Sequence, residues 1–108
     1  MKASLLFIIA TAASSQAAII RMYPRLNCQG DYQERNIWDN TCAPTDEFWS
    51  YTVVFGGGSG QYLRAYCPHN CGNWDVNSCK NAQSLNVCYN AVSSCGSSHA
   101  IGSSLFEC

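Results

Sequence analysis

Two histidines, His69 and His99, are residues of a type that can serve as general acid or general base. Together with the glutamates and arginines they supply the residue types for cleaving a phosphodiester, in which a general base and a general acid flank the phosphate. The sequence contains no Glu-x-Pro strand and no spaced His-Glu-Arg set. Both histidines lie among turn-forming residues, so we expect them to be exposed and assign no catalytic residue.

A second candidate is the segment Cys67-Pro-His-Asn-Cys71, which has Cys79 nearby. Its thiols and imidazole are zinc ligand types, but the spacing is not that of a zinc finger or zinc knuckle. Exported thiols usually oxidise before they meet a metal ion. We therefore expect disulfides here, and we assign no metal and no cofactor to the chain.

The segment Asp46-Glu47-Phe48-Trp49-Ser50 resembles the calcium loop of βγ-crystallins, in which two Asn or Asp residues precede a Ser/Thr-Ser pair. Glu47 replaces the second Asn or Asp, and Tyr51 stands in place of the second serine. Residues 99–104 carry the serines without the acids. We expect no calcium site.

The eight cysteines are the strongest signal in the sequence, and all of them lie after the first 27 residues. An even number in a short exported chain predicts a disulfide framework, here of four bonds. Eight cysteines allow about 105 pairings, and spacing alone does not choose among them. The predicted disulfide residues are Cys28, Cys42, Cys67, Cys71, Cys79, Cys88, Cys95 and Cys108.

The N-terminal segment 1–17 has the features of a secretory signal peptide: Lys2, an apolar run from Leu5 to Ala12, and small residues thereafter. Ser15 and Ala17 form a small-x-small cleavage site, so the mature chain is expected to start at Ala18. The apolar run is about half of what a bilayer-spanning helix needs, and no second run follows. The sequence predicts a secreted protein without a membrane anchor.

Charge excludes some partners. Removal of segment 1–17 removes Lys2 and leaves five basic against seven acidic side chains, a net charge of −2. Nucleic acids and anionic membranes usually bind basic surfaces, so we expect neither partner. A strongly cationic antimicrobial peptide is disfavoured for the same reason. We expect residues 18–108 to form a single, monomeric domain that needs cross-links to supplement a small core.

The sequence shows a short internal match at an offset of 43 residues, where residues 20–28 align with residues 63–71 at four identical positions of nine. The match predicts two related halves, residues 18–55 and 61–108, joined by a glycine-rich connection at residues 56–60. That connection lacks the Lys-Ser/Thr of a phosphate-binding loop.

Alternating apolar and polar residues at 20–23 and 62–66 predict a strand at the start of each half. A β-branched and aromatic run at 51–55 predicts another, and residues 78–92 allow at most one short helical turn. We therefore predict a small, disulfide-rich, mainly β fold in which two Greek-key-like halves pack as one β-sandwich, with at most a short helix near residues 80–90.

Aromatic residues could fill the core or form a binding surface. In so small a domain we expect most of them to pack inside. The residues concerned are Tyr32, Trp38, Trp49, Tyr51, Tyr62, Trp74 and Tyr89.

Each half has a strand ending in Tyr, then Asn-Cys, a glycine and an aromatic residue, and the chain closes with Ile101-Gly-Ser-Ser-Leu-Phe-Glu-Cys108. This pattern resembles the small secreted cysteine-rich proteins of filamentous fungi, several of which look like degenerate βγ-crystallin Greek-key domains. The resemblance implies a non-enzymatic, effector-like or virulence-associated protein that binds a host protein or a cell-wall or cell-surface component. The alternatives are an antifungal or killer-type toxin and, less favoured, a small secreted ribonuclease.

Overall fold

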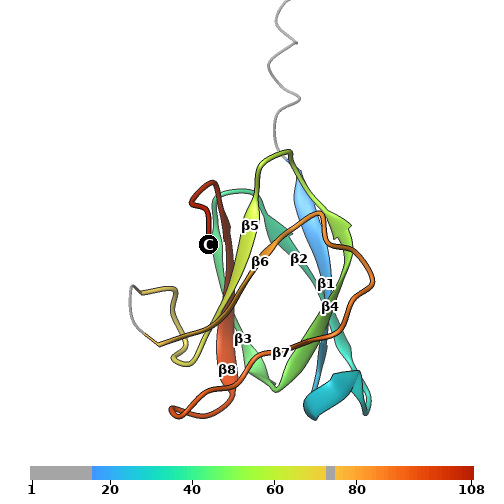
Figure 1. Cartoon of the computed structure of the whole chain (residues 1–108), viewed down its shortest axis with the longest axis vertical. Coiled ribbons are helices and arrows are strands. Elements are labelled where there is room, and N and C mark those ends of the chain that lie inside the picture. The colour runs from blue at the N-terminus through green and yellow to red at the C-terminus, as the bar shows by residue number, and fades with distance from the viewer. Residues whose placement is uncertain (1–15, 73–74) are drawn as a thin grey trace, which may run out of the picture.

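The computed structural model describes residues 16–72 and 75–108. The predicted signal peptide therefore lies outside the described residues, except for Gln16 and Ala17, and so does Trp74. Within these two ranges the chain forms eight strands and one short 3-10 helix (Figure 1). The elements are β1 (Ala17–Tyr23), η2 (Leu26–Cys28), β2 (Gln33–Trp38), β3 (Cys42–Phe48), β4 (Ser50–Gly56), β5 (Tyr62–Tyr66), β6 (Val76–Asn81), β7 (Tyr89–Asn90) and β8 (Ser98–Ser104).

The strands form two four-stranded antiparallel sheets that face each other (Figure 1). Sheet A has the order β2-β1-β4-β7, and sheet B has the order β3-β8-β5-β6. Each half of the chain therefore gives one strand to the other half's sheet: β3 crosses to sheet B and β7 crosses to sheet A. This exchange joins the two halves through backbone hydrogen bonds as well as side-chain packing.

The two sheets are built on the same plan. β1 pairs with β2 and β4 in sheet A, and β5 pairs with β6 and β8 in sheet B. The remaining edge positions belong to β7 in sheet A and to β3 in sheet B. Each strand of one sheet therefore has an equivalent strand in the other sheet whose number differs by four, such as β1 and β5. The strands that start the internal sequence match, β1 and β5, thus occupy equivalent central positions.

The core lies between the sheets and follows from alternation along the strands. In β1, Ala18, Ile20 and Met22 are buried, whereas the residues between them are half-exposed. In an extended strand successive side chains point to opposite faces, so such a pattern buries one face only. The remaining members of the buried core are Ile37, Phe48, Tyr51, Val53, Leu63, Ala65, Ala82, Ala91 and Ile101.

The predicted fold class is confirmed: the protein is small, disulfide-linked and mainly β, with two Greek-key-like halves in one sandwich. The predicted strands at 20–23, 51–55 and 62–66 correspond to β1, β4 and β5. Residues 80–90 contain no helix, only the end of β6, a loop and β7. Among the described residues, no helix is long and apolar enough to cross a membrane.

Three disulfides connect distant parts of the chain: Cys28–Cys88, Cys42–Cys71 and Cys79–Cys108. The structure differs from the expected four bonds at Cys67 and Cys95, which carry free thiols. These two cysteines lie close together, because the sulfur of Cys67 is 3.1 Å from the carbonyl oxygen of Cys95 and donates a hydrogen bond to it.

Candidate binding groove

One row of residues crosses the outer face of sheet B. Cys42 on β3 lies opposite Gly102 on β8, Gly102 lies opposite Arg64 on β5, and Arg64 lies opposite Cys79 on β6. Directly opposed residues of antiparallel strands share a face. The neighbouring positions Leu63 and Ile101 are buried in the core, so the row faces away from the core.

Each end of this row is a cysteine on an edge strand, and each cysteine fastens a separate segment to the sheet. At the β3 edge, Cys42 binds Cys71 of the loop after β5. At the β6 edge, Cys79 binds Cys108, the last residue of the chain. The space between the two fastened segments is a groove, and Gly102 and Arg64 lie between its ends.

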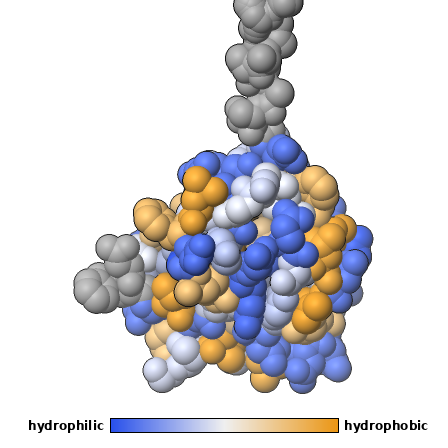
Figure 2. Space-filling model, turned by 45° about the horizontal axis from the view of Figure 1, so that its top comes forward, coloured by the Kyte–Doolittle hydropathy of each residue, from blue (hydrophilic) through white to orange (hydrophobic). Residues whose placement is uncertain are grey.

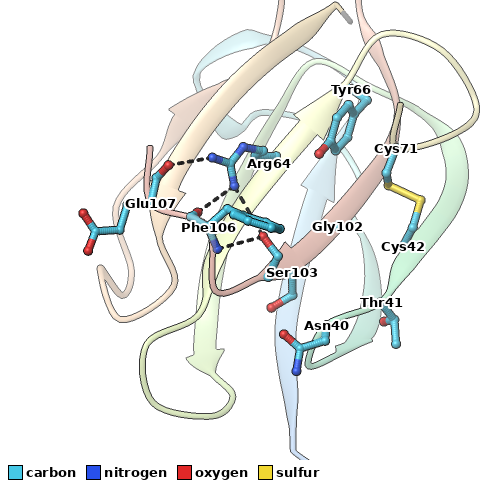
Figure 3. A pocket seen from close by; sticks show the side chains of 11 residues that line it. Asn40, Thr41, Cys42, Arg64, Tyr66, Cys71, Gly102, Ser103, Phe106 and Glu107 are labelled. Atoms are coloured by element: carbon cyan, nitrogen blue, oxygen red, sulfur yellow. Dashed lines mark hydrogen bonds between the residues drawn. A yellow bond between two sulfur atoms is a disulfide. The ribbon is translucent and has the colours of Figure 1, made fainter. Parts of the chain in front are cut away.

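We call this space the outer groove; it encloses about 620 Å³. Figure 3 shows its lining, with Phe106 and the Cys42–Cys71 disulfide on opposite sides of Gly102. The lining residues are Asn40, Thr41, Cys42, Arg64, Tyr66, Cys71, Gly102, Ser103, Ser104, Phe106 and Glu107. Aromatic, amide and hydroxyl groups thus dominate its chemistry.

Gly102 keeps the groove open. A Cβ atom at this position would lie 3.1 Å from the sulfur of Cys71 and 3.4 Å from the carbonyl oxygen of Thr41. These approaches are tight for a real side chain. A larger residue would therefore occupy the floor and push against the Cys42–Cys71 disulfide.

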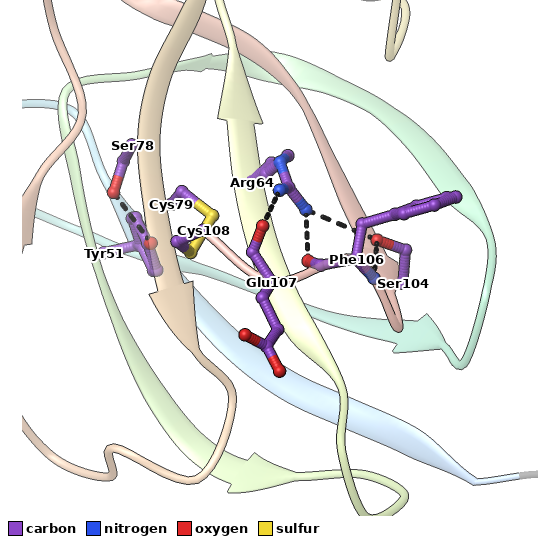
Figure 4. The surroundings of a disulfide bond; sticks show 8 residues. All are labelled: Tyr51, Arg64, Ser78, Cys79, Ser104, Phe106, Glu107 and Cys108. Carbon is purple, nitrogen blue, oxygen red and sulfur yellow. Dashed lines mark hydrogen bonds between the residues drawn. A yellow bond between two sulfur atoms is a disulfide. The ribbon is translucent and has the colours of Figure 1, made fainter.

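Arg64 holds the C-terminal segment in place. Its guanidinium donates one hydrogen bond to the carbonyl oxygen of Phe106 and another to that of Glu107, each 2.8 Å long. It also contacts the hydroxyl of Ser104 at 3.4 Å, and this hydroxyl accepts a hydrogen bond from the backbone N–H of Phe106. Figure 4 shows these contacts beside the Cys79–Cys108 disulfide. The charge of Arg64 is thus directed at backbone oxygens of the same chain.

The segment so fastened carries the most exposed large apolar side chain that the structure describes. Phe106 is 77% exposed and its neighbour Leu105 is 61% exposed. An unfixed terminus would leave such residues mobile, but here the backbone is held by a disulfide and two charge-assisted hydrogen bonds. The backbone that carries the exposed aromatic ring is therefore held at the groove.

The two predicted histidines come together at a second place, the His-Cys corner, defined by Cys67, His69, Cys95 and His99. The imidazole rings lie 5.1 Å apart between centroids. The Nδ1 atom of His99 is 2.7 Å from the carbonyl oxygen of Cys67. Because a carbonyl oxygen only accepts, this contact requires a proton on Nδ1. His69 is exposed as expected, whereas His99 is half-buried.

The cysteines of the zinc alternative are divided between different partners. Cys71 and Cys79 are in disulfides, and only Cys67 remains near a histidine. Among residues 16–72 and 75–108, no three or more His, Cys, Asp or Glu side chains are arranged to hold a metal ion.

The polar residues of the calcium-loop candidate, segment 46–50, make hydrogen bonds within the protein. The carboxylate of Glu47 accepts a hydrogen bond from the hydroxyl of Ser97. The hydroxyl of Ser50 donates to the carbonyl oxygen of Arg25 and accepts from the backbone N–H of Cys28. Both groups therefore serve contacts between segments of the fold.

Most of the aromatic residues expected in the core are not there. Of those that the structure describes, only Tyr51 is fully buried, while Tyr32 and Trp38 are 46% and 52% exposed. The expectation was wrong because the small interior is filled largely by aliphatic side chains and Phe48. On the face shown in Figure 2, hydrophobic residues form several separate patches divided by hydrophilic ones.

Comparisons with protein-family models, curated proteins and solved structures found no match to this chain.

Sequence reasoning missed the outer groove because its members are distant in the chain. Arg64 lies 42 and 43 residues from the two carbonyl groups that it binds, and no local pattern reveals such a contact. One signal was present, however. Only Glu107 separates the apolar pair Leu105-Phe106 from Cys108, so a disulfide at Cys108 keeps this pair close to the strand that carries the partner cysteine.

Proposed function

We propose that this chain is a secreted, non-enzymatic binding protein of the effector type, which binds a host or cell-surface component through the outer groove. The observation that carries the proposal is the 77% exposed ring of Phe106 at the edge of a groove of about 620 Å³, on a backbone segment that Arg64 and the Cys79–Cys108 disulfide hold in place. Exposed aromatic anchors held in place lose little entropy on binding and often supply much of the binding energy.

Export is part of the proposal and has two supports. The sequence of residues 1–17 predicts a signal peptide. Three disulfides link segments that are 29 or 60 residues apart in the sequence, and such bonds persist in oxidising compartments. The relation to fungal cysteine-rich proteins of βγ-crystallin-like fold is likewise proposed, on the sequence pattern and on the equivalent strand order of the two halves.

The chemistry of the groove favours an uncharged polar ligand with apolar faces. Phe106 offers an exposed aromatic surface, whereas Tyr66 in the lining is only 8% exposed, and Asn40, Thr41 and Ser104 offer amide and hydroxyl groups. The one arginine already binds backbone carbonyls, which lowers its availability for an anionic ligand. A saccharide chain combines hydroxyl groups with apolar C–H faces, so we propose a cell-wall or cell-surface glycan as the component bound.

The test is binding of the purified secreted protein to insoluble glucan and chitin and to an array of soluble neutral oligosaccharides. We expect binding by the unmodified protein and a loss of at least ten-fold in affinity for F106A. The matched control is F55A, because Phe55 is also an exposed aromatic, at 47%, but lies on β4 of the other sheet. Equal loss in both variants, or unchanged binding by F106A, would contradict the assignment of the groove.

A second candidate function is that of a ribonuclease, and one observation favours it. His69 and His99 are 30 residues apart in the sequence, but their imidazole ring centroids lie 5.1 Å apart. Two histidines at such a distance could serve as base and acid. The test is RNA cleavage by the purified protein and by its H69A and H99A variants. Cleavage that both substitutions abolish would rank this function above binding, whereas cleavage that persists in both variants would indicate a contaminating nuclease.

A further inference from the structure

Two of the eight cysteines, Cys67 and Cys95, remain outside the three disulfides. Cys67 directly follows β5, and Cys95 lies in the loop between β7 and β8. Although 28 residues separate them, they contact each other, since the sulfur of Cys67 is 3.1 Å from the carbonyl oxygen of Cys95. The fold has thus brought the last two cysteines to the same place.

The backbone around Cys95 is fixed by a tight turn. Ser93 and Gly96 exchange two backbone hydrogen bonds, of 3.1 and 2.9 Å, which close a turn with Cys95 inside it. The sulfur of Cys95 lies 3.1 Å from the hydroxyl oxygen of Ser93 and 3.5 Å from the amide oxygen of Asn77. Cys95 is exposed to solvent, so a small thiol reagent can reach it.

The two thiols also interact with each other. A side-chain hydrogen bond with Cys95, followed by burial, raises the pKa of the Cys67 thiol to about 11. Cys67 therefore stays protonated near neutral pH while its neighbour is the more exposed sulfur. Of the two sulfurs, that of Cys95 is therefore the one that a small disulfide reagent reaches first.

We propose that Cys67 and Cys95 form a fourth disulfide by exchange with a small-molecule disulfide such as oxidised glutathione. The thiolate of Cys95 attacks one sulfur of glutathione disulfide, and one glutathione thiolate leaves. The sulfur of Cys67 then loses its proton to water and attacks the sulfur of Cys95, which breaks the mixed disulfide and releases the second glutathione thiolate. Two thiols are oxidised and one glutathione disulfide is reduced to two thiols.

The bond would close a ring from the end of β5 to the turn before β8, which encloses β6 and β7. It would also fix the carbonyl group of Cys67, which accepts the hydrogen bond of His99. Closing a loop removes conformational freedom from the unfolded chain, so the bond raises the denaturation temperature. The consequence is local to the His-Cys corner and independent of the outer groove.

The experiment counts thiols by intact mass. The purified full mature chain is equilibrated with either reduced or oxidised glutathione, then alkylated with iodoacetamide without further reduction. With oxidised glutathione we expect no alkylated thiol and no bound glutathione, and with a mild reduced buffer we expect two alkylated thiols. The matched variants are C67S and C95S, each of which should expose one reactive thiol, and the double variant C67S/C95S, which should expose none.

Counting is preferable to tryptic mapping here. Residues 65–80 contain no lysine or arginine before Lys80, so Cys67, Cys71 and Cys79 share one tryptic peptide. The double variant also tests the stability effect, because its denaturation temperature should match that of the reduced protein and lie below that of the oxidised protein. The unmodified chain alone still decides the proposal if a variant fails to fold.

Three outcomes would overturn the inference. The first is two alkylated thiols that persist in oxidised glutathione, and the second is glutathione stably attached to either cysteine of the unmodified chain. The third has two parts: added Zn²⁺ protects both thiols of the reduced protein from alkylation, and both cysteines stay reduced in oxidised glutathione. That result would make the His-Cys corner a metal site.

Discussion

The phenol oxygen of Tyr51 lies 3.0 Å from the hydroxyl oxygen of Ser78, and this hydrogen bond joins the two sheets (Figure 4). Tyr51 belongs to β4 of sheet A and Ser78 to β6 of sheet B. Tyr51 is fully buried and Ser78 is 9% exposed. Two polar groups in a small core are tolerated because each satisfies the other.

Removing either partner should therefore have unequal effects. We expect S78A to destabilise the fold by about 1 to 3 kcal/mol, because the buried phenol loses its partner, and Y51F to cost about 1 kcal/mol. The double variant Y51F/S78A should cost less than the sum of the two. Urea denaturation of the four proteins measures the coupling, and strict additivity would show that the two groups do not interact.

Tyr51 also predicts a dependence on alkaline pH. Burial is the main cause that raises its pKa well above the ordinary value of 10.0. A group whose folded pKa is raised contributes its full stability below the unfolded pKa and loses it as the pH rises above that value. The free energy of unfolding should fall above about pH 10 in the unmodified protein and fall less in Y51F. Equal pH profiles for the two proteins would contradict this account.

Arg64 should control the order of the C-terminal segment. We expect R64A to speed hydrogen exchange of the Phe106 amide at least ten-fold, because the segment loses the hydrogen bonds to two backbone carbonyls. R64K keeps the charge but not the two-pronged geometry, so its exchange should be intermediate. The control is R21A, because Arg21 binds Glu34 on the other sheet; the same increase in R21A would show a global loss of stability.

The sequence was sufficient for features that depend on local patterns. Alternation along residues 20–23 and 62–66 marked β1 and β5, and the β-branched run at 51–55 marked β4. The repeated segments also indicated two related halves. The cysteine count predicted a cross-linked fold, which three bonds support.

The rest depends on contacts between distant residues. No local sequence pattern predicts the exchange of β3 and β7 between sheets, because the residue pattern of an edge strand is the same in either sheet. The outer groove was hidden for the same reason, since Gly102 and Arg64 become neighbours only through the pairing of β8 with β5. The aromatic residues misled the interpretation, because hydrophobicity alone does not distinguish Trp38, at 52% exposed, from Tyr51, at 0%.

The sequence predicts that the mature chain starts at Ala18, and Asp39 is the candidate counterion for that predicted terminus. A Cβ on Gly57 would lie 2.9 Å from the backbone nitrogen of Ala18 and 2.9 Å from the Oδ1 atom of Asp39, so both atoms border the same small space beside Gly57. Oδ1 also accepts a hydrogen bond from the backbone N–H of Gly58. Cleavage after Ala17 would turn the nitrogen of Ala18 into an ammonium group beside this carboxylate.

We therefore expect D39N to destabilise the mature chain that starts at Ala18 by about 0.5 to 1 kcal/mol, because asparagine keeps the acceptor for Gly58 but removes the charge. The same substitution should have little effect in a chain that retains Gln16 and Ala17, whose backbone nitrogen at Ala18 is an uncharged amide. Urea denaturation of both pairs, at low and at high salt, measures the difference. D31N serves as control, since Asp31 is exposed.

Two results would contradict this prediction. A loss of stability of the same size in both chain lengths would show that Asp39 acts through Gly58 rather than through the new terminus. N-terminal sequencing of the secreted protein that begins at a residue other than Ala18 would remove the premise.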